Sequence, residues 1–292
     1  MHFSCGINRP PYEAYDGFLQ VTSGCSHGSC EFCTFYKESP FMISPMEEVE
    51  ADIKELGESP YKFERIYLQG ADPFILPTER LLKIADLIYK YIPSVKSIGG
   101  YARIDNVDNK SVEDLKKLVK AGYSNFYFGN ESGDNNILDV MHKGYKADEV
   151  VRQCRKMDEA GMEYILNFLG GLGGHEYGYD HARKSAEVIN QTHPTLVYAS
   201  ELTLFPDTPL MKSKRNGSFV EATEEERLEE MKEFIKCLTI KTIFIAEHTT
   251  IPIPVKGVLP DDKDRLMKQL DEEIEMARAG KMDHFRENVR GL

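Results

Sequence analysis

Short apolar runs alternate with amphipathic segments along most of the chain. The apolar runs predict strands at Phe18–Thr22, Arg65–Leu68, Lys96–Tyr101, Ser124–Phe128, Glu163–Phe168, Leu196–Leu204 and Thr242–Ala246. Between them, apolar residues recur at the three- and four-residue spacing of a helix. A strand followed by a helix, repeated six or seven times, is typical of a parallel sheet with helical crossovers.

Several of the predicted helices have recognisable ends. The segment Ser44-Pro45-Met46-Glu47 predicts a serine N-cap with proline at the first helical position, opening a helix to about Leu56. Ser111 and Thr223 are expected to cap later helices in the same way. Further helices are expected at Thr78–Tyr91, Asn135–His142, Ala147–Ala160, Tyr179–Thr192, Glu224–Leu238 and Asp261–Ala279, and the one capped by Ser111 is expected to stop at Ala121-Gly122.

The strand count falls short of the eight strands of a closed barrel. The expected fold class is therefore α/β, a partial (β/α)6-type TIM barrel with a C-terminal extension. No break in composition divides residues 1–292, so a single domain is expected, with a core at about 15–250 and a strap and helix at about 251–292. The strap is expected at Pro252 to Pro260, which is too rich in proline for a helix or a central strand.

The chain carries a formal charge of −12. Enzymes that act on nucleic acid usually present a basic surface, because phosphate contacts supply much of their affinity. The acidic balance therefore favours a small-molecule substrate over nucleic acid. Residues 1–12 lack the apolar segment of a signal peptide, and no run approaches the roughly 20 apolar residues of a membrane span. A cytoplasmic protein without a membrane anchor is expected.

Three of the six cysteines, Cys25, Cys30 and Cys33, lie within nine residues at the spacing C-x4-C-x2-C. Thiolates at this density favour a soft metal or an iron–sulfur cluster. A zinc site needs a fourth ligand at a familiar spacing, and a plant-type ferredoxin needs a fourth cysteine, but the next cysteine is Cys154 on a predicted helix. A thioredoxin-like pair leaves Cys25 unexplained. Three thiolates without a fourth would leave one iron of a [4Fe–4S] cluster open to a small chelating ligand.

This loop, placed after the first strand of a partial barrel, resembles the radical S-adenosylmethionine (SAM) superfamily over about residues 15–260. The resemblance implies a [4Fe–4S] cluster on the three cysteines, with SAM bound at the open iron. It also implies reductive cleavage of SAM to a 5′-deoxyadenosyl radical that abstracts hydrogen from a substrate. The first cysteine spacing is one residue longer than in most of the superfamily, and a loop that contains glycine can absorb the insertion.

The same resemblance implies how SAM is held. The cofactor-binding residues it implies are Phe32, Gly70, Ala71, Asp72, Arg103, Glu131, Asn167, Leu204 and Phe205. Tyr101, Asn130, Glu201 and His248 lie near predicted strand ends and are candidate substrate residues. Ordinary alternatives remain open: Glu131 can cap the helix that follows it, and Arg103 can form a simple salt bridge.

Chain size and loop spacing also resemble the queuine lyase type, which cleaves a 7-deazaguanine base to release its cyclopentenyl side arm. The alternatives are an anaerobic porphyrin-precursor oxidase or a tRNA-modifying radical SAM enzyme. From a different class, a non-catalytic iron–sulfur electron-transfer protein would also use the cysteines. A radical enzyme of this kind implies a reducing partner such as flavodoxin or ferredoxin.

Overall fold

The computed structural model describes residues 1–289, which form two compact units. The first unit comprises Met1–Gly28, Phe35–Gly129 and Gln153–Tyr164, and the second comprises Ser29–Thr34, Asn130–Arg152 and the chain from Ile165 onwards. Both units are built from strands that alternate with helices, so the α/β class predicted from the sequence is confirmed. The single-domain organisation stays a prediction.

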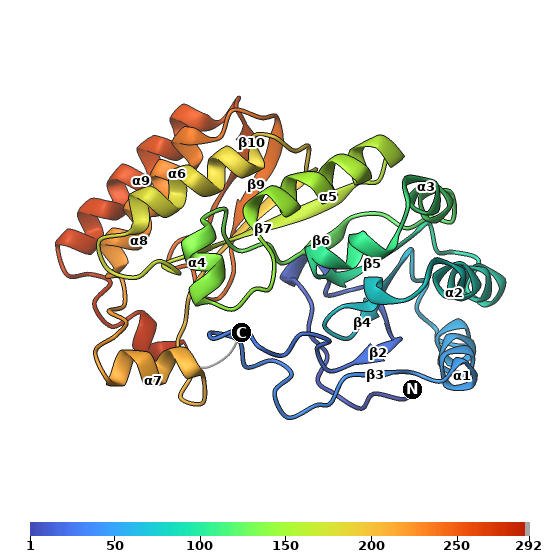
Figure 1. Ribbon diagram of the computed structural model, residues 1–292. Helices are drawn as coiled ribbons and strands as arrows, with labels where there is room; N and C mark the ends of the chain where they lie inside the picture. Colours follow the sequence, from blue (N-terminus) through green and yellow to red (C-terminus); the bar gives the residue numbers. More distant parts are fainter. Residues whose placement is uncertain (290–292) are drawn as a thin grey trace. The chain divides into compact units, whose positions relative to one another are not determined.

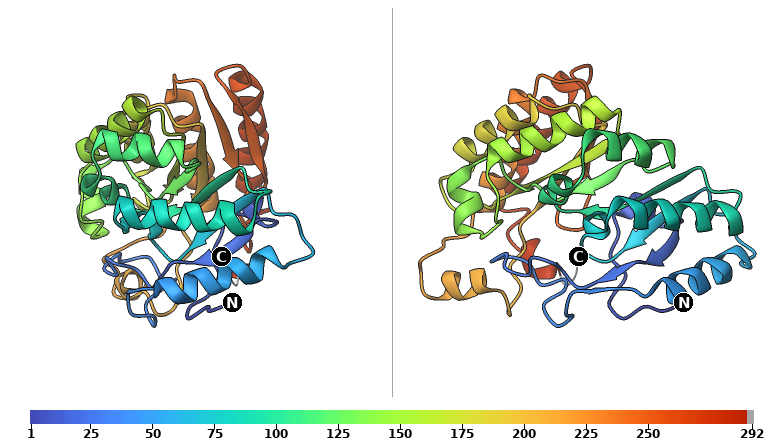
Figure 2. Two further views of the ribbon diagram at one scale, coloured as in Figure 1. Left: turned by 90° about the vertical axis from the view of Figure 1, so that its right-hand side faces the viewer. Right: turned by 45° about the vertical axis from the view of Figure 1, so that its right-hand side comes forward.

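The first unit contains a parallel sheet in the order β1, β4, β5, β6. These strands are β1 (Gly17–Gln20), β4 (Arg65–Gln69), β5 (Ser97–Ala102) and β6 (Phe126–Phe128). Helices α1 (Met46–Gly57), α2 (Thr78–Tyr91) and α3 (Val112–Lys120) lie side by side along the strands (Figures 1 and 2). Short 3-10 turns lie at η1 (Pro11–Glu13), η2 (Pro73–Ile75) and η3 (Ile104–Asn109).

The second unit places β7 (Tyr164–Gly170), β8 (Leu196–Glu201) and β9 (Thr242–Ala246) in parallel, with β10 (Val255–Leu259) antiparallel to β9. Helices α6 (Gly178–Ile189), α8 (Glu224–Cys237) and α9 (Lys263–Arg278) pack side by side in this unit (Figure 1). Its shorter elements are α4 (Asn135–Val140), α7 (Pro209–Arg215) and η4 (Arg286–Asn288), while α5 (Ala147–Ala160) contributes to both units.

The first predicted strand is divided in the structure. β1 ends at Gln20, and Thr22 belongs to β2 (Thr22–Ser23), which pairs antiparallel with β3 (Met42–Ile43). Two-residue strands are too short to produce a periodic pattern, so the sequence did not predict this pair. The β2–β3 ladder brings together the two ends of the segment that contains the closely spaced cysteines.

The predicted Ser44 cap is wrong, whereas the other two caps are confirmed. Helix α1 begins at Met46 with Pro45 at the N-cap position, and no side chain caps it. Ser44 lies one residue too far upstream for its hydroxyl to reach the free N–H groups. The Ser111 hydroxyl accepts from the Asp114 N–H at 3.1 Å, and the Thr223 hydroxyl accepts from the Glu226 N–H at 3.2 Å.

The segment predicted as a C-terminal strap contains the strand β10, which pairs with β9 at the end of the sheet. Prolines lie before and after β10 but not within it, so proline removes no N–H from its pairing with β9. The closing helix is confirmed as α9. Among the described residues, no helix has both the length and the apolar composition that crossing a bilayer would require.

Lys110 fixes the turn that follows β4 in the first unit. Its buried Nζ donates to the carbonyl oxygens of Phe74, at 2.5 Å, and Leu76, at 3.1 Å. Burial lowers the pKa of Lys110 to about 8. The folded protein therefore holds this proton less tightly than the unfolded chain does.

The lowered pKa predicts a pH-dependent stability. Between about pH 8 and 10.5 the unfolded chain binds a proton that the folded state lacks, so the free energy of unfolding should rise with pH. The rise should be at most about 3 kcal/mol and should be missing in Lys110→Met. Urea unfolding across this window measures it, with the exposed Lys83→Met as control. Parallel curves for wild type and Lys110→Met would contradict the prediction.

Candidate functional site

The cysteine loop begins directly after β2. Cys25 belongs to the first unit, and Cys30 and Cys33 belong to the second. All three lie outside any disulfide and have intermediate exposure. The backbone N–H of Gly28 donates to Cys25 Sγ at 3.4 Å, so this glycine fixes the sulfur within the loop.

The donor set of the loop, three cysteines within nine residues, fits an iron–sulfur cluster. Among the described residues, no three His, Cys, Asp or Glu side chains lie close enough together to hold a metal ion. Metal binding can itself assemble thiolates on a loop, because binding is coupled to local folding. The three cysteines lie outside any disulfide on one short loop, with Gly28 between the first two, so they remain candidate ligands.

Gly70, Ala71 and Asp72 form the turn after β4, as the sequence predicted. Gly70 has a φ of +107°, and a Cβ there would lie 2.1 Å from Thr22 Oγ1. Only glycine fits this position. The Ala71 N–H donates to the carbonyl oxygen of Gly24 at 3.3 Å, which fixes the turn against the start of the cysteine loop.

Asp72 is a buried carboxylate with one oxygen in use. Its Oδ2 accepts from the Ser26 hydroxyl, while Oδ1 has no hydrogen-bond partner among the described residues. Burial raises the pKa of Asp72 above its ordinary value. An ammonium group placed at Oδ1 would satisfy the oxygen and stabilise the charged form. The residue therefore fits the amino group of SAM, the cofactor that the sequence resemblance assigned to this turn.

Arg103 and Tyr101 have partners within the first unit. The Arg103 guanidinium donates to both carboxylate oxygens of Asp105, at 3.0 and 2.7 Å. The ion pair within the turn is thus the arrangement observed for Arg103. The Tyr101 ring meets the rings of Tyr67 and Tyr127 edge to face, with centroids 5.6 and 5.1 Å apart.

Glu131 follows β6 in a left-handed conformation, with a φ of 54°. Its carboxylate pairs with the buried Nζ of Lys143. The same Nζ lies 5.7 Å from the ring centroid of Phe32 and 5.5 Å from that of Tyr145. The helix-cap alternative for Glu131 is wrong, because the Asp134 side chain accepts from the Asn136 N–H and caps α4. A cation and an anion flanked by rings suit a zwitterionic ligand.

The sequence analysis did not identify Lys143. It lies between α4 and α5 in the segment His142-Lys143-Gly144, which matches no motif. Lysines in such connections are usually solvated, and only its burial beside Glu131 distinguishes this one.

Asn130 and Asn167 are both buried and joined to each other. The Asn130 side-chain oxygen accepts from the Asn167 backbone N–H at 2.9 Å. The Leu169 N–H donates to the Glu131 carbonyl oxygen at 3.0 Å, which adds a second tie to β7. Asn130 therefore positions the segment that carries Glu131.

An apolar cluster supports the second half of the cysteine loop. Its buried members are Ile137, Met141, Leu169, Leu172, Leu202 and Leu210, and the partly buried Phe32 and Leu204 pack against it. The backbone of Glu31 bonds to Met141 and Leu210, at 3.3 and 3.0 Å. Phe205 is half-buried, and its carbonyl oxygen accepts from the N–H and hydroxyl of Thr208. Phe32 and Leu204 thus share one packing environment.

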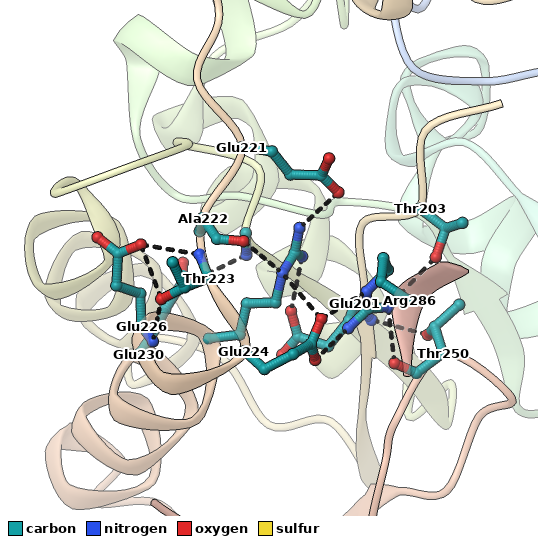
Figure 3. A network of polar contacts seen from close by, with 12 residues as sticks. Glu201, Thr203, Glu221, Ala222, Thr223, Glu224, Glu226, Glu230, Thr250 and Arg286 are labelled. Atoms are coloured by element: carbon teal, nitrogen blue, oxygen red, sulfur yellow. Dashed lines mark hydrogen bonds and ion pairs between the residues drawn. The ribbon is translucent and has the colours of Figure 1, made fainter. Parts of the chain in front are cut away.

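Glu201 ends β8 inside a buried charge network (Figure 3). Arg227 Nη1 lies 3.3 Å from the Glu201 carboxylate, and its Nη2 lies 3.0 Å from that of Glu221. Burial raises the pKa of Glu201 to about 8, and Arg227 opposes that rise. A Cβ on Gly171 would lie 2.1 Å from Arg227 Nη1. The buried guanidinium therefore explains why glycine follows β7 at this position.

His248 is also engaged within the second unit. Its Nδ1 lies 3.0 Å from the hydroxyl of Thr250, which accepts from the Glu201 N–H at 3.0 Å. Burial lowers the pKa of His248, so the ring is neutral at pH 7. Glu201 and His248 therefore serve the packing of this unit in the arrangement observed.

A protein-family model described as the Radical SAM superfamily matches residues 19–189. The heme chaperone HemW of Bacillus subtilis (strain 168) is 25% identical over 178 residues, which cover 58% of this chain and 46% of the relative. The tRNA-2-methylthio-N(6)-dimethylallyladenosine synthase of Psychrobacter sp. (strain PRwf-1) is 23% identical over 280 residues, which cover 91% of this chain and 54% of the relative. The chain thus spans about half the length of these curated relatives.

Solved structures share the fold at low sequence identity. Coproporphyrinogen III oxidase (HemN) from Escherichia coli aligns with a TM-score of 0.57 and 10% identity, covering 76% of this chain and 51% of that one. Methylornithine synthase (PylB) aligns with a TM-score of 0.54 and 16% identity, and the alignment covers 89% of this chain and 81% of that one. These likenesses confirm the fold class predicted from the strand–helix alternation.

The Asp72 carboxylate, with only one of its two oxygens hydrogen-bonded, yields a prediction. Asp72→Asn should leave the free energy of unfolding at pH 7 unchanged or raise it by about 1 kcal/mol, because a buried charge is removed. That gain should vanish as the pH falls below the raised pKa of Asp72, where the wild type is also neutral. SAM affinity, measured by calorimetry, should fall about tenfold or more, since the ammonium loses its charged partner.

The exposed Asp86→Asn serves as the control for lost charge. Equal SAM affinity in Asp72→Asn and wild type would remove Asp72 from the binding residues.

Proposed function

The chain belongs to the radical SAM superfamily, and on this premise we propose that it uses a SAM-derived radical on a small-molecule substrate. Its cofactors are a [4Fe–4S] cluster and SAM. When bound together under reducing conditions, they supply a 5′-deoxyadenosyl radical that abstracts hydrogen from the substrate. The protein's own part is to hold the cofactors, orient the substrate and exclude water.

We assign the cluster to Cys25, Cys30 and Cys33. Support comes from their position outside any disulfide and from the N–H···S bond of Gly28 to Cys25. Backbone bonds of Glu31 to Met141 and Leu210 hold the chain between the second and third cysteines, so those ligands need little ordering when a cluster binds.

The unused oxygen of buried Asp72 is the observation that carries the SAM assignment. We assign the amino group of SAM to this carboxylate and to the Gly70–Ala71 turn. Lys143 and Glu131 already pair with each other, so a carboxylate at Lys143 or a ribose hydroxyl at Glu131 would have to bind beside that ion pair. We propose Phe32, Asn167, Leu204 and Phe205 as adenine-side residues, whereas Arg103 would first have to leave Asp105.

For the substrate we retain queuine, which makes the proposed reaction a lyase reaction. The formal charge of −12 supports a small molecule over a nucleic acid. Asn130, Glu201 and His248 already have partners inside the protein, so they support substrate binding only weakly.

A tRNA-modifying enzyme is the second candidate, because synthases that modify tRNA are among the relatives aligned over most of this chain. A porphyrin-precursor oxidase is supported only by shared fold. A non-catalytic electron carrier would need the cysteines but not the turn at Gly70–Asp72. The buried carboxylate in this turn therefore favours a SAM-binding enzyme over an electron carrier.

We further propose a reducing partner such as flavodoxin or ferredoxin. All six cysteines lie outside disulfides, which suits the reducing cytoplasm that we propose as the location.

The proposed radical chemistry predicts a specific product. After anaerobic cluster reconstitution, SAM and dithionite should yield 5′-deoxyadenosine, detected by chromatography. The triple variant Cys25→Ala, Cys30→Ala, Cys33→Ala should lose the brown chromophore and all product while its far-ultraviolet circular dichroism stays native. The matched variant Cys5→Ala, Cys154→Ala, Cys237→Ala should keep the chromophore. An intact cluster without any 5′-deoxyadenosine would exclude a radical SAM enzyme.

The queuine assignment is tested separately. Queuine should accelerate SAM cleavage at least about tenfold, a change of roughly 1.4 kcal/mol in the barrier, and should release 7-aminomethyl-7-deazaguanine. An unchanged rate with queuine, together with acceleration by a tRNA adenosine substrate, would favour the second candidate.

A further inference from the structure

One face of the sheet in the first unit carries polar and aromatic side chains. The register pairs Gln20 of β1 with Gln69 of β4, and Tyr101 of β5 with Tyr127 of β6. Tyr67 lies two residues before Gln69 on β4. Because side chains alternate along a strand and stay aligned across the register, these five residues share one face.

The two glutamines of this face differ in how their hydrogen bonds are used. Gln20 bonds to Ser4 at both ends: its oxygen accepts from the Ser4 N–H at 2.9 Å, and its Nε2 donates to the Ser4 hydroxyl at 3.0 Å. The Gln69 oxygen accepts from the Asn8 N–H at 3.2 Å. The other terminal atom of Gln69 is therefore an NH2 donor, and it is buried without a partner among the described residues.

Tyr67 presents a second unused donor. Its ring is completely buried, and its hydroxyl has no hydrogen-bond partner among the described residues. Burial raises the pKa of Tyr67 well above 10, so the hydroxyl keeps its proton. Residues two apart on one strand lie about 7 Å apart along it. Folded proteins rarely leave buried donors unpaired, and two neighbouring ones point to a bound molecule with acceptor atoms.

The surroundings favour a flat, uncharged ligand. Tyr67, Tyr101 and Tyr127 meet edge to face, so they offer ring surfaces rather than charges. The cation on this face, Arg65, is compensated by Glu13 at 3.0 Å and lies nearer the start of β4.

We propose that Tyr67 and Gln69 form a substrate subsite for an uncharged aromatic heterocycle with carbonyl or ring-nitrogen acceptors, such as a deazapurine base. The inference rests on the proposed function, because Gln69 directly precedes the Gly70–Asp72 turn assigned to SAM. The two donors hydrogen-bond to acceptors on the base, and the tyrosine rings pack around it. The subsite thus supplies the substrate contacts that Asn130, Glu201 and His248 do not offer.

Calorimetry on the cluster-loaded protein with SAM, without reductant, tests the subsite in the absence of turnover. The probe is 7-deazaguanine, which the wild type should bind. Tyr67→Phe and Gln69→Met should each weaken binding about tenfold, the effect of one lost hydrogen bond. Gln20→Met, on the same face but already paired, and the exposed Tyr61→Phe should bind the probe as the wild type does.

A second measurement separates binding from folding. Tyr67→Phe removes a hydroxyl that has no protein partner, so its melting temperature without the probe should equal or exceed that of the wild type. A lowered melting temperature would show that the hydroxyl serves the fold and would overturn the subsite. No binding of 7-deazaguanine by wild type that still forms 5′-deoxyadenosine would overturn the subsite alone. Binding without any 5′-deoxyadenosine would overturn the proposed function alone.

Discussion

Parallel strands place their carboxyl ends at one edge of a sheet, and the candidate site depends on this constraint in each unit. In the first unit, β4 leads into Gly70–Asp72 and β5 leads into Arg103. In the second, β7 leads into Gly171, and β8 ends at Glu201. Short connections at these ends bring polar residues together that the helices would otherwise separate.

The buried charges at these edges fall into two kinds. Arg227 is satisfied by Glu201, Glu221 and a backbone carbonyl, so its network is complete and explains local packing. Asp72, by contrast, has an oxygen without a partner among the described residues, as do the hydroxyl of Tyr67 and the amide nitrogen of Gln69. Hydrogen-bond networks in which every group has a partner stabilise the fold, whereas groups without a partner are suited to bind a ligand.

Local signals predicted most of the fold. The caps at Ser111 and Thr223 and the strand–helix alternation depend on residues close in sequence, and the structure contains them. The failures involve longer-range pairing: β2 exists only because Met42–Ile43 lies beside it, and β10 exists only because β9 offers a free edge. No local periodicity reveals a partner strand.

By itself, the sequence determined the elements whose information is local. The spacing of Cys25, Cys30 and Cys33, with the family resemblance that it carries, predicted an iron–sulfur cluster, and the alternation of apolar runs predicted the fold class. Only the tertiary structure decided which polar residues are already paired. It placed Lys143 against Glu131, and Arg227 against Glu201, 26 residues away in the chain. It left one carboxylate oxygen of Asp72 without a hydrogen-bond partner among the described residues. Such pairings depend on strand register and helix packing, which bring distant residues together and bury them where an unpaired charge or donor is costly.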